Sequence, residues 1–297
     1  MASSTKPVWF VTAASSGFGR EIVHIALRRG HVVIATARKP DRIQDLANAG
    51  ADVMAFDVTS PKETIDATAK QVFGKYGRVD YLINAAGYIL EGAVEEITKE
   101  EVFKCFDTNV FGAMSTIRAF LPGMRAQAVA ANGVRGTVVT FGSLGSWVGG
   151  ASYAAYGMTK ASTSMLAEAL SLELAPFSIR VTAVEPGYFR TGFLNPGTML
   201  HARTPIDAYE DENTPTGESR RALTRTDGKQ AGDVKKGSNV IVDALTGTGV
   251  GAGKQLPVRI VLGKDCEQTI RDKFTSTVRI LDEWKDAIRS TDHDDVA

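Results

Sequence analysis

Short apolar runs alternate with longer helical patterns along most of the chain, and this alternation constrains the fold more than any other feature. Seven runs rich in Val and Ile are predicted strands, at residues 8–12, 32–37, 53–57, 79–84, 137–141, 180–185 and 258–262. They are mostly unbroken, which is typical of parallel strands buried on both faces. Helical patterns follow at residues 19–29, 61–76, 98–126, 153–175 and 233–245. The sequence therefore predicts an α/β protein with a doubly wound parallel sheet of about seven strands and helices on both faces.

The length and charge of the chain narrow the class of protein. A chain of 297 residues suits one large α/β domain with a full-sized core, so we expect a single domain over residues 1–297. Lys plus Arg and Asp plus Glu both number 34, and the formal net charge is zero. Without a global basic field, the sequence predicts no nucleic-acid partner and no general attraction to an anionic membrane.

Cysteine and histidine usage indicates neither a disulfide framework nor a metal centre. Cys105 and Cys266 stand alone, and no two of the four histidines have metal-ligand spacing. Lys6-Pro7 interrupts the N-terminal segment, and the longest uncharged stretch, residues 136–159, contains six glycines. We therefore expect no secretory signal, no membrane-spanning segment and a cytoplasmic location.

Two segments stand outside the regular alternation. Residues 193–236 are rich in Pro, Gly, Thr and charge, lack a convincing period, and leave from a carboxyl end of the sheet, where ligands bind in such folds. We interpret them as a mobile substrate lid, with a disordered excursion as the alternative. Residues 265–290 are predicted to form an amphipathic helix whose stripe of Ile270, Phe274, Val278, Leu281 and Trp284 serves core packing or subunit contact.

A glycine-containing turn joins the first predicted strand to the first predicted helix. Its residues are Ser15-Ser16-Gly17-Phe18-Gly19. Backbone N–H groups at a helix N-terminus can hold a pyrophosphate where no bulky side chain blocks the approach, and the two glycines leave it open. The position after the first strand of a repeated βα pattern favours a dinucleotide site over a turn that needs glycine for steric reasons alone.

The end of the second predicted strand indicates which dinucleotide binds. An acidic residue there would accept the ribose hydroxyls of NAD, but the sequence has Ala37, Arg38 and Lys39. Ala37 leaves room, and the two cations can pair with a 2′-phosphate. We therefore predict NADP(H), with a solvated basic loop as the alternative interpretation.

A tyrosine and a lysine four residues apart share one face of the helix predicted over residues 153–175. A free phenol has a pKa of ~10, and an ammonium ~4 Å away stabilises the phenolate by about 4 kcal/mol at an effective dielectric constant of ~20. Tyr156 beside Lys160 is therefore a candidate general acid/base, although an i,i+4 surface pair is the simpler alternative. Ser143 follows the fifth strand, where its hydroxyl can donate to a substrate carbonyl oxygen.

Six motifs in this order resemble those of the short-chain dehydrogenase/reductase family. They are Thr12-Ala13-x-x-x-Gly17-x-Gly19, Asn84-Ala85-Ala86-Gly87, Asn109, Ser143, Tyr156-x-x-x-Lys160 and Pro186-Gly187-x-x-x-Thr191. The resemblance covers residues 7–191 and implies a Rossmann-type domain that interconverts a carbonyl and a secondary alcohol by hydride transfer. Residues 262–265 and the helix after them look like the 17β-hydroxysteroid and retinol dehydrogenase-like branch. One position departs from the family, since Ala13 stands where its first glycine would be.

The resemblance also implies roles for individual residues. Tyr156 would be the general acid/base, Ser143 would position the substrate oxygen, and Asn109 would hold a water that joins Lys160 to solvent. The implied cofactor contacts are Asp57 and Val58 at the adenine, Asn84, Ala85 and Ala86 on the ribose and nicotinamide side, Pro186, Gly187, Phe189 and Thr191 around the nicotinamide, and Tyr156 and Lys160. Family members often pair through the catalytic helix and the long helix before it, which implies a homodimer or homotetramer.

Apolar residues around the lid predict a hydrophobic pocket and hence a bulky lipophilic ketone or alcohol as substrate. They are Leu90, Trp147, Val148, Tyr153, Phe189, Phe193, Leu194, Met199 and Leu200, whereas His201 is interpreted as a solvated loop histidine. Two alternatives keep the NADP site but change its use. One is isomerisation, dehydration or cyclisation without net hydride transfer. The other is a non-catalytic NADP-responsive regulator, which the retention of Ser143, Tyr156 and Lys160 argues against.

Overall fold

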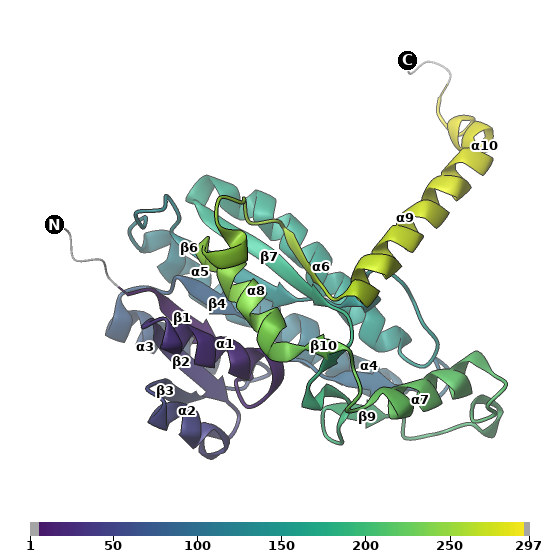
Figure 1. The fold of residues 1–297 in the computed structure, drawn as a ribbon, viewed down its shortest axis with the longest axis horizontal. Coiled ribbons are helices and arrows are strands. Elements are labelled where there is room, and N and C mark those ends of the chain that lie inside the picture. The colour runs from purple at the N-terminus through teal and green to yellow at the C-terminus, as the bar shows by residue number, and fades with distance from the viewer. Residues whose placement is uncertain (1–5, 294–297) are drawn as a thin grey trace.

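Seven strands form one parallel sheet in the computed structural model, which describes residues 6–293 (Figure 1). The order across the sheet is β11-β7-β6-β4-β1-β2-β3. The strands are β1 (Val8–Val11), β2 (Val32–Ala37), β3 (Asp52–Ala55), β4 (Tyr81–Ile83), β6 (Gly136–Phe141), β7 (Ile179–Pro186) and β11 (Arg259–Leu262). All seven predicted strands are confirmed within two residues at each end, and so is the doubly wound α/β class.

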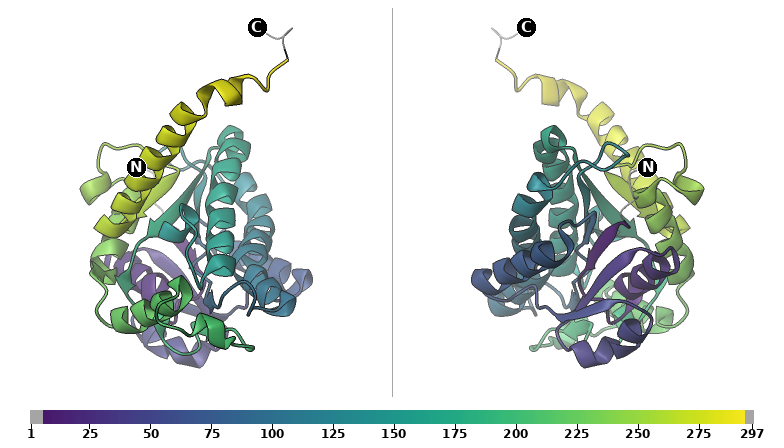
Figure 2. Two further views of the ribbon diagram at one scale, coloured as in Figure 1. Left: turned by 90° about the vertical axis from the view of Figure 1, so that its right-hand side faces the viewer. Right: turned by 90° about the vertical axis from the view of Figure 1, so that its left-hand side faces the viewer.

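Helices cover both faces of this sheet (Figure 2). On one face α1 (Gly17–Arg28) packs with α8 (Val234–Thr246), and on the other lie α3 (Lys62–Tyr76), α5 (Gly112–Ala126) and α6 (Ala154–Leu174). Successive side chains of a strand point to opposite faces, so Trp9 of β1 enters the first core and Phe10 the second, both fully buried. This two-sided burial explains why the strand sequences are unbroken apolar runs.

The helix predicted over residues 98–126 is confirmed, with one irregularity that the sequence does not show. It consists of α4 (Lys99–Phe106), a π-helical turn (Asp107–Phe111) and α5, which follow one another without a break. A π-turn adds one residue to a helix without interrupting its apolar pattern, so the pattern does not reveal it. The extra residue places Asn109 in the interior, where it is 2% exposed.

Residues 193–236 contain more secondary structure than the sequence predicts. Strand β9 (Met199–His201) pairs with β5 (Ile89–Glu91), and β10 (Gly232–Asp233) pairs with β8 (Phe189–Arg190). Helix α7 (Pro215–Thr226) lies between them, so the alternative of a disordered excursion is wrong there, and the mobile lid stays a prediction. Its buried residues are Thr216, Gly217 and Leu223. Only Leu223 among them is large and apolar, and a single such residue cannot produce a helical period in the sequence. A short helix, α2 (Gln44–Asn48), was also not predicted.

The last helices, α9 (Lys264–Glu283) and α10 (Lys285–Arg289), extend away from the sheet (Figures 1 and 2). Only the first turns of α9 contact the body, where Cys266 is buried and the Asp265 carboxylate accepts from the Tyr188 N–H at 2.6 Å. The Phe274 ring lies 5.6 Å from that of Trp147 but is still 55% exposed, and beyond it Val278 is 53% and Trp284 60% exposed. Core packing of this stripe is therefore a wrong prediction, and subunit contact stays a prediction. Within residues 6–293, no helix combines the length and the apolar character needed to cross a bilayer.

Candidate active site

A cavity of about 560 Å³ opens where the sheet strands end at their carboxyl edge. Most residues predicted for the cofactor and the chemistry line it. They are Ser15, Ser16, Gly17, Phe18, Gly19, Arg38, Asp57, Val58, Ala85, Ala86, Ser143, Tyr156, Lys160, Pro186, Gly187, Phe189 and Thr191. Lys39, Asn84 and Asn109 do not line the cavity, although the last two support its walls.

The turn after β1 is built to receive an anion. Ser16, the N-cap of α1, makes no side-chain capping bond, and the first turn of this 12-residue helix contains no acidic residue. A Cβ on Gly19 would lie 2.9 Å from the Ala13 carbonyl oxygen, so only glycine lets the helix start this close to the strand. The N–H groups of α1 therefore face the cavity without a competing side chain, an arrangement that fits a pyrophosphate.

Ala13, which stands where the family has a glycine, adopts a left-handed conformation with φ of 53°. Gly17 in the same turn has φ of 58°. The turn thus keeps the backbone path that a glycine would allow, at the conformational cost that a Cβ pays in this region.

Thr12 organises the loop that follows β4. Its Oγ1 accepts hydrogen bonds from the backbone N–H groups of Ala85 at 2.9 Å and Ala86 at 3.2 Å. The Asn84 side chain donates through Nδ2 to the Val139 carbonyl at 3.1 Å, while its buried Oδ1 has no partner among the described residues. Asn84 thus joins two strand ends, and Ala85 and Ala86 form the cavity wall.

At the end of β2, Arg38 and Ala37 line the cavity whereas Lys39 lies outside it. Arg38 is exposed. Asp57, after β3, accepts from the Thr59 N–H at 3.0 Å and from the Thr59 hydroxyl at 2.8 Å. This corner therefore places Arg38 at the cavity beside a small residue, and the part predicted for Lys39 stays a prediction.

Ser143 follows β6 and is held in place through its backbone and side chain. Its N–H donates to Ser146 Oγ at 3.1 Å, and its Oγ accepts from the Gly145 N–H at 3.2 Å. Since Oγ is the acceptor in the second bond, its own hydrogen can be donated toward Tyr156, to the phenol oxygen in the free protein or to a substrate oxygen beside it. That is the donor that a substrate oxygen would need.

Tyr156 and Lys160 lie on α6 as the spacing predicts, with Lys160 Nζ 5.6 Å from the centre of the Tyr156 ring. The Nζ atom donates to the Phe141 carbonyl at 2.9 Å. Burial lowers the pKa of Lys160 from its ordinary value of 10.5 to about 8. Burial also raises the pKa of Tyr156, and the Ser143 hydroxyl offsets only part of this rise. Desolvation is therefore the largest influence on the phenol in the free protein, and the i,i+4 spacing alone does not reveal it.

Asn109 is fixed by the π-turn. Its Oδ1 accepts from the Tyr88 N–H at 3.0 Å, and its Nδ2 donates at 3.0 Å both to the Tyr88 carbonyl and to Thr159 Oγ1. A Cβ on Gly87 would lie 3.2 Å from Asn109 Oδ1 and 3.4 Å from Lys160 Nζ. The amide and the amine therefore face the same glycine from two helices.

The other end of the cavity is largely apolar. Of the predicted pocket residues, Tyr153, Phe189, Phe193, Leu194 and Leu200 line it, and Leu90, Trp147, Val148 and Met199 do not. Trp147 turns away because its Nε1 donates to Glu185 Oε2 at 2.8 Å. Sequence reasoning missed Tyr188, Leu223 and Gln230. Tyr188 follows the Pro186-Gly187 motif, which was a usable signal, whereas α7 brings in Leu223 from a segment with no recognisable pattern.

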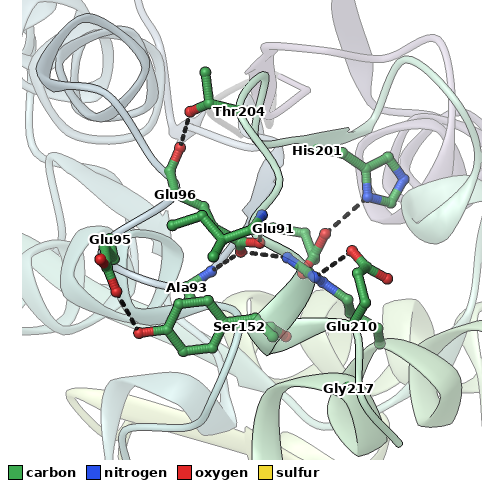
Figure 3. A network of polar contacts seen from close by, with 12 residues as sticks. Glu91, Ala93, Glu95, Glu96, Ser152, His201, Thr204, Glu210 and Gly217 are labelled. Atoms are coloured by element: carbon green, nitrogen blue, oxygen red, sulfur yellow. Dashed lines mark hydrogen bonds and ion pairs between the residues drawn. The ribbon is translucent and has the colours of Figure 1, made fainter.

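Buried carboxylates attach residues 193–236 to the body (Figure 3). Arg220 of α7 pairs with Glu91 at 2.8 Å, with Glu210 at 2.6 Å, and with Glu96. Glu91 and Glu96 are 2% and 1% exposed. His201 pairs with Glu91 at 2.8 Å and lies outside the cavity lining. The segment is therefore clamped over the cavity by ion pairs.

A doubly wound parallel sheet with a glycine turn after its first strand, and with Ser, Tyr and Lys at the same edge, defines a nucleotide-binding oxidoreductase. The chain belongs to the short-chain dehydrogenase family, whose model matches residues 7–198. It is 30% identical to oxidoreductase BOA17 of Botryotinia fuckeliana, over 87% of this chain and 89% of that protein. It is 36% identical to a 3-ketodihydrosphingosine reductase of Bacteroides thetaiotaomicron, over 68% of this chain and 71% of the relative.

Solved structures agree with this assignment. A short-chain dehydrogenase from Streptomyces avermitilis has a TM-score of 0.85 and 37% identity, covering 97% of this chain and all of that one. A family member from Burkholderia phymatum in complex with NAD shares the fold, with a TM-score of 0.71 and 20% identity over the full length of both chains. A serine dehydrogenase complexed with NADP+ has a TM-score of 0.66 and 25% identity, covering 86% of this chain and 93% of its own. The family thus binds NAD or NADP.

Proposed function

We propose that the protein is an NADP(H)-dependent oxidoreductase that interconverts a carbonyl and a secondary alcohol on a bulky lipophilic molecule. One observation carries this proposal. Ser143, Tyr156 and Lys160 line the same cavity as the uncapped N-terminus of α1. A dinucleotide phosphate group and a reacting oxygen can therefore be bound in one continuous space.

The preference for NADP rests on the corner after β2. Arg38 lines the cavity, is exposed and can pair with a 2′-phosphate, and Ala37 stands where a carboxylate would repel that group. We expect Ala37→Asp combined with Arg38→Ala to shift the NADP/NAD affinity ratio toward NAD by at least tenfold. Lys39→Ala, outside the cavity, is the matched control and should change the ratio little. An unchanged ratio in the double variant would contradict the preference.

The chain's own residues supply proton transfer and substrate positioning, while the bound dinucleotide supplies the hydride at the carbonyl carbon. Burial raises the pKa of Tyr156, so the phenol is protonated at neutral pH and suited to give a proton to the carbonyl oxygen. Ser143 donates its free hydroxyl hydrogen to the same oxygen. Lys160 supports the phenolate that remains, and a water between Lys160 and Asn109 returns the proton.

The substrate class follows from the apolar end of the cavity. Tyr153, Phe193, Leu194 and Leu200 favour a lipophilic body around one reacting oxygen. The Bacteroides relative is by its name a reductase of a keto compound, which agrees with a ketone as substrate. Assignment to the 17β-hydroxysteroid and retinol dehydrogenase-like branch remains part of this proposal.

The test is a panel of lipophilic ketones with NADPH, followed by nicotinamide absorbance and product analysis. Tyr156→Phe should lower turnover by about 10³-fold or more and leave the dinucleotide Kd unchanged. Tyr153→Phe, which removes a phenol oxygen from the same cavity, is the matched control and should retain most activity. Product formed without net NADPH loss would favour isomerisation, dehydration or cyclisation, and full activity in Tyr156→Phe would refute the mechanism.

We further propose a homo-oligomer. The helices α4 to α6 expose several large apolar side chains, among them Phe103, Met158 and Met165, each more than half exposed. Apolar area of this kind is typical of an interface. Light scattering at micromolar concentration tests the proposal, and a strictly monomeric protein would contradict it.

A further inference from the structure

A buried carboxylate at the end of β7 lies close to the catalytic edge, and the mechanism above does not use it. Glu185 is fully buried. Its Oε1 accepts from Arg259 Nη1 at 2.5 Å and from Ser164 Oγ at 2.6 Å, and its Oε2 accepts from Trp147 Nε1 at 2.8 Å. Arg259 is held in turn by Glu168 at 2.6 Å and stacks over the Trp147 ring at 4.5 Å. The carboxylate is thus fixed from three sides.

Two serine hydroxyls connect this carboxylate to the backbone of Ser143. The Ser164 and Ser146 hydroxyl oxygens lie 2.9 Å apart, and Ser146 Oγ accepts from the Ser143 N–H at 3.1 Å. Ser164 is fully buried on α6, one turn beyond Lys160. The contacts form an unbroken path from Glu185 through Ser164 and Ser146 to Ser143.

The charge of the carboxylate gives this path a direction. Each hydroxyl has one hydrogen, and an ionised carboxylate can only accept. Ser164 therefore donates its hydrogen to Glu185, and its oxygen accepts from the Ser146 hydroxyl. The Ser146 oxygen in turn accepts from the Ser143 N–H. In that arrangement no hydroxyl orientation is left free, and each bond polarises the next.

Gly142, immediately before Ser143, is shaped around the same path. A Cβ at this position would lie 2.3 Å from Ser164 Oγ, 2.9 Å from Ser146 Oγ and 3.0 Å from Glu185 Cγ. The three groups therefore pack directly against the backbone that carries Ser143. Any larger residue would displace the path or the strand end.

We propose that Glu185, acting through Ser164 and Ser146, is a positioning residue that fixes the orientation of the Ser143 hydroxyl. The carboxylate holds the Ser146 side chain against the Ser143 N–H, and this sets the turn in which Gly145 donates to Ser143 Oγ. The hydrogen that Ser143 keeps is then aimed into the cavity without reorganisation during the reaction. This inference rests on the proposed function for its kinetic readout and stands on the local geometry for its structural one.

Ser164→Ala tests the proposal because it removes one oxygen atom and thereby interrupts the path between Glu185 and Ser146. We expect kcat to fall by about 10- to 100-fold with the dinucleotide Kd unchanged, since misplacing a reacting group by ~1 Å can cost that much. Ser162→Ala on the same helix is the matched control, because that hydroxyl donates only to the Met158 carbonyl near solvent. Its kcat should stay within twofold of the wild-type value.

A double-mutant cycle separates positioning from general damage. In a Ser143→Ala background, Ser164→Ala should cost nothing further, because the group that it positions is gone. An equal loss in both backgrounds, or full activity in Ser164→Ala, would overturn the proposal. A crystal structure of Ser164→Ala gives a readout that needs no turnover, with Ser146 turned away from the Ser143 N–H as the expected result. An unmoved Ser143 turn would overturn the proposal, whereas a wild-type protein inactive on the ketone panel would count against the proposed function.

Discussion

Replacing Lys160 by methionine should stabilise the dinucleotide-free protein while abolishing its turnover. Burial lowers the pKa of this amine from 10.5 to about 8, which means that the folded state disfavours its charge. At ~1.4 kcal/mol per pKa unit, the charged form costs folding about 3 kcal/mol at neutral pH. Methionine has nearly the same length and carries no charge, so it removes this cost without leaving a cavity.

The loss of one hydrogen bond reduces the expected gain. Lys160 Nζ donates to the Phe141 carbonyl at 2.9 Å. Thr163 Oγ1 lies 3.2 Å from that carbonyl and 3.0 Å from the Lys160 carbonyl, so its single hydrogen is shared between the two acceptors and only partly replaces the lost bond. Allowing ~1 kcal/mol for the lost bond leaves a net stabilisation of about 2 kcal/mol. Urea denaturation at pH 7 without dinucleotide measures it, with exposed Lys70→Met as the control for a surface lysine.

The pH dependence gives a sharper test. The folded-state pKa lies below the unfolded value, so the cost is complete below pH 8 and disappears as the pH rises toward 10.5. The advantage of Lys160→Met over the wild type should therefore shrink between pH 8 and 10 and vanish near the upper end. A variant no more stable than the wild type at pH 7, or an advantage independent of pH, would refute the reasoning.

Three further outcomes are expected. Ala13→Gly should stabilise the protein by up to about 1 kcal/mol in urea denaturation, since relief of a left-handed alanine exceeds the added chain entropy; destabilisation would contradict this. Arg220→Met should lower the free energy of unfolding by about 3 kcal/mol and speed proteolysis within residues 203–230, because Glu91 and Glu96 lose their buried partner. Arg225→Met, at an exposed position on the same helix, should cost under ~1 kcal/mol. Ketone reduction should slow above pH 8 as Lys160 loses its proton, and a flat profile to pH 10 would contradict that assignment.

The sheet was predictable because its strands are buried on both faces, which leaves an unbroken apolar run at each of them. Ser143 and Tyr156 were proposed from the sequence for another reason. Ser143 follows the end of a strand, and Tyr156 lies four residues before Lys160 on one face of a helix, which is the spacing that an acid/base pair needs. The strand signal is local in sequence, whereas the pair of Tyr156 and Lys160 becomes a candidate site only together with the glycine turn and Ser143 elsewhere in the chain.

Features set by contacts between distant segments were not predictable. Helix α7 is held by Arg220 and two buried glutamates rather than by an apolar stripe, so no period marks it. The π-turn at Asn109 leaves the helical pattern intact. Trp147 looked like a pocket residue because it is aromatic and close to Ser143, but a hydrogen bond to Glu185 turns it away.

The two parts of α9 differ in how far they contact the rest of the domain. Its first turns belong to the domain, because Asp265 binds the Tyr188 backbone, Cys266 is buried, and Phe274 meets Trp147 with ring centres 5.6 Å apart. The remainder keeps its apolar side in water within a single copy of the chain. The boundary of the independently stable unit therefore falls inside a continuous helix. A shortened version ending after residue 276 would keep every residue that lines the cavity and lose the exposed apolar side chains of Val278, Ile280, Leu281, Trp284 and Ile288.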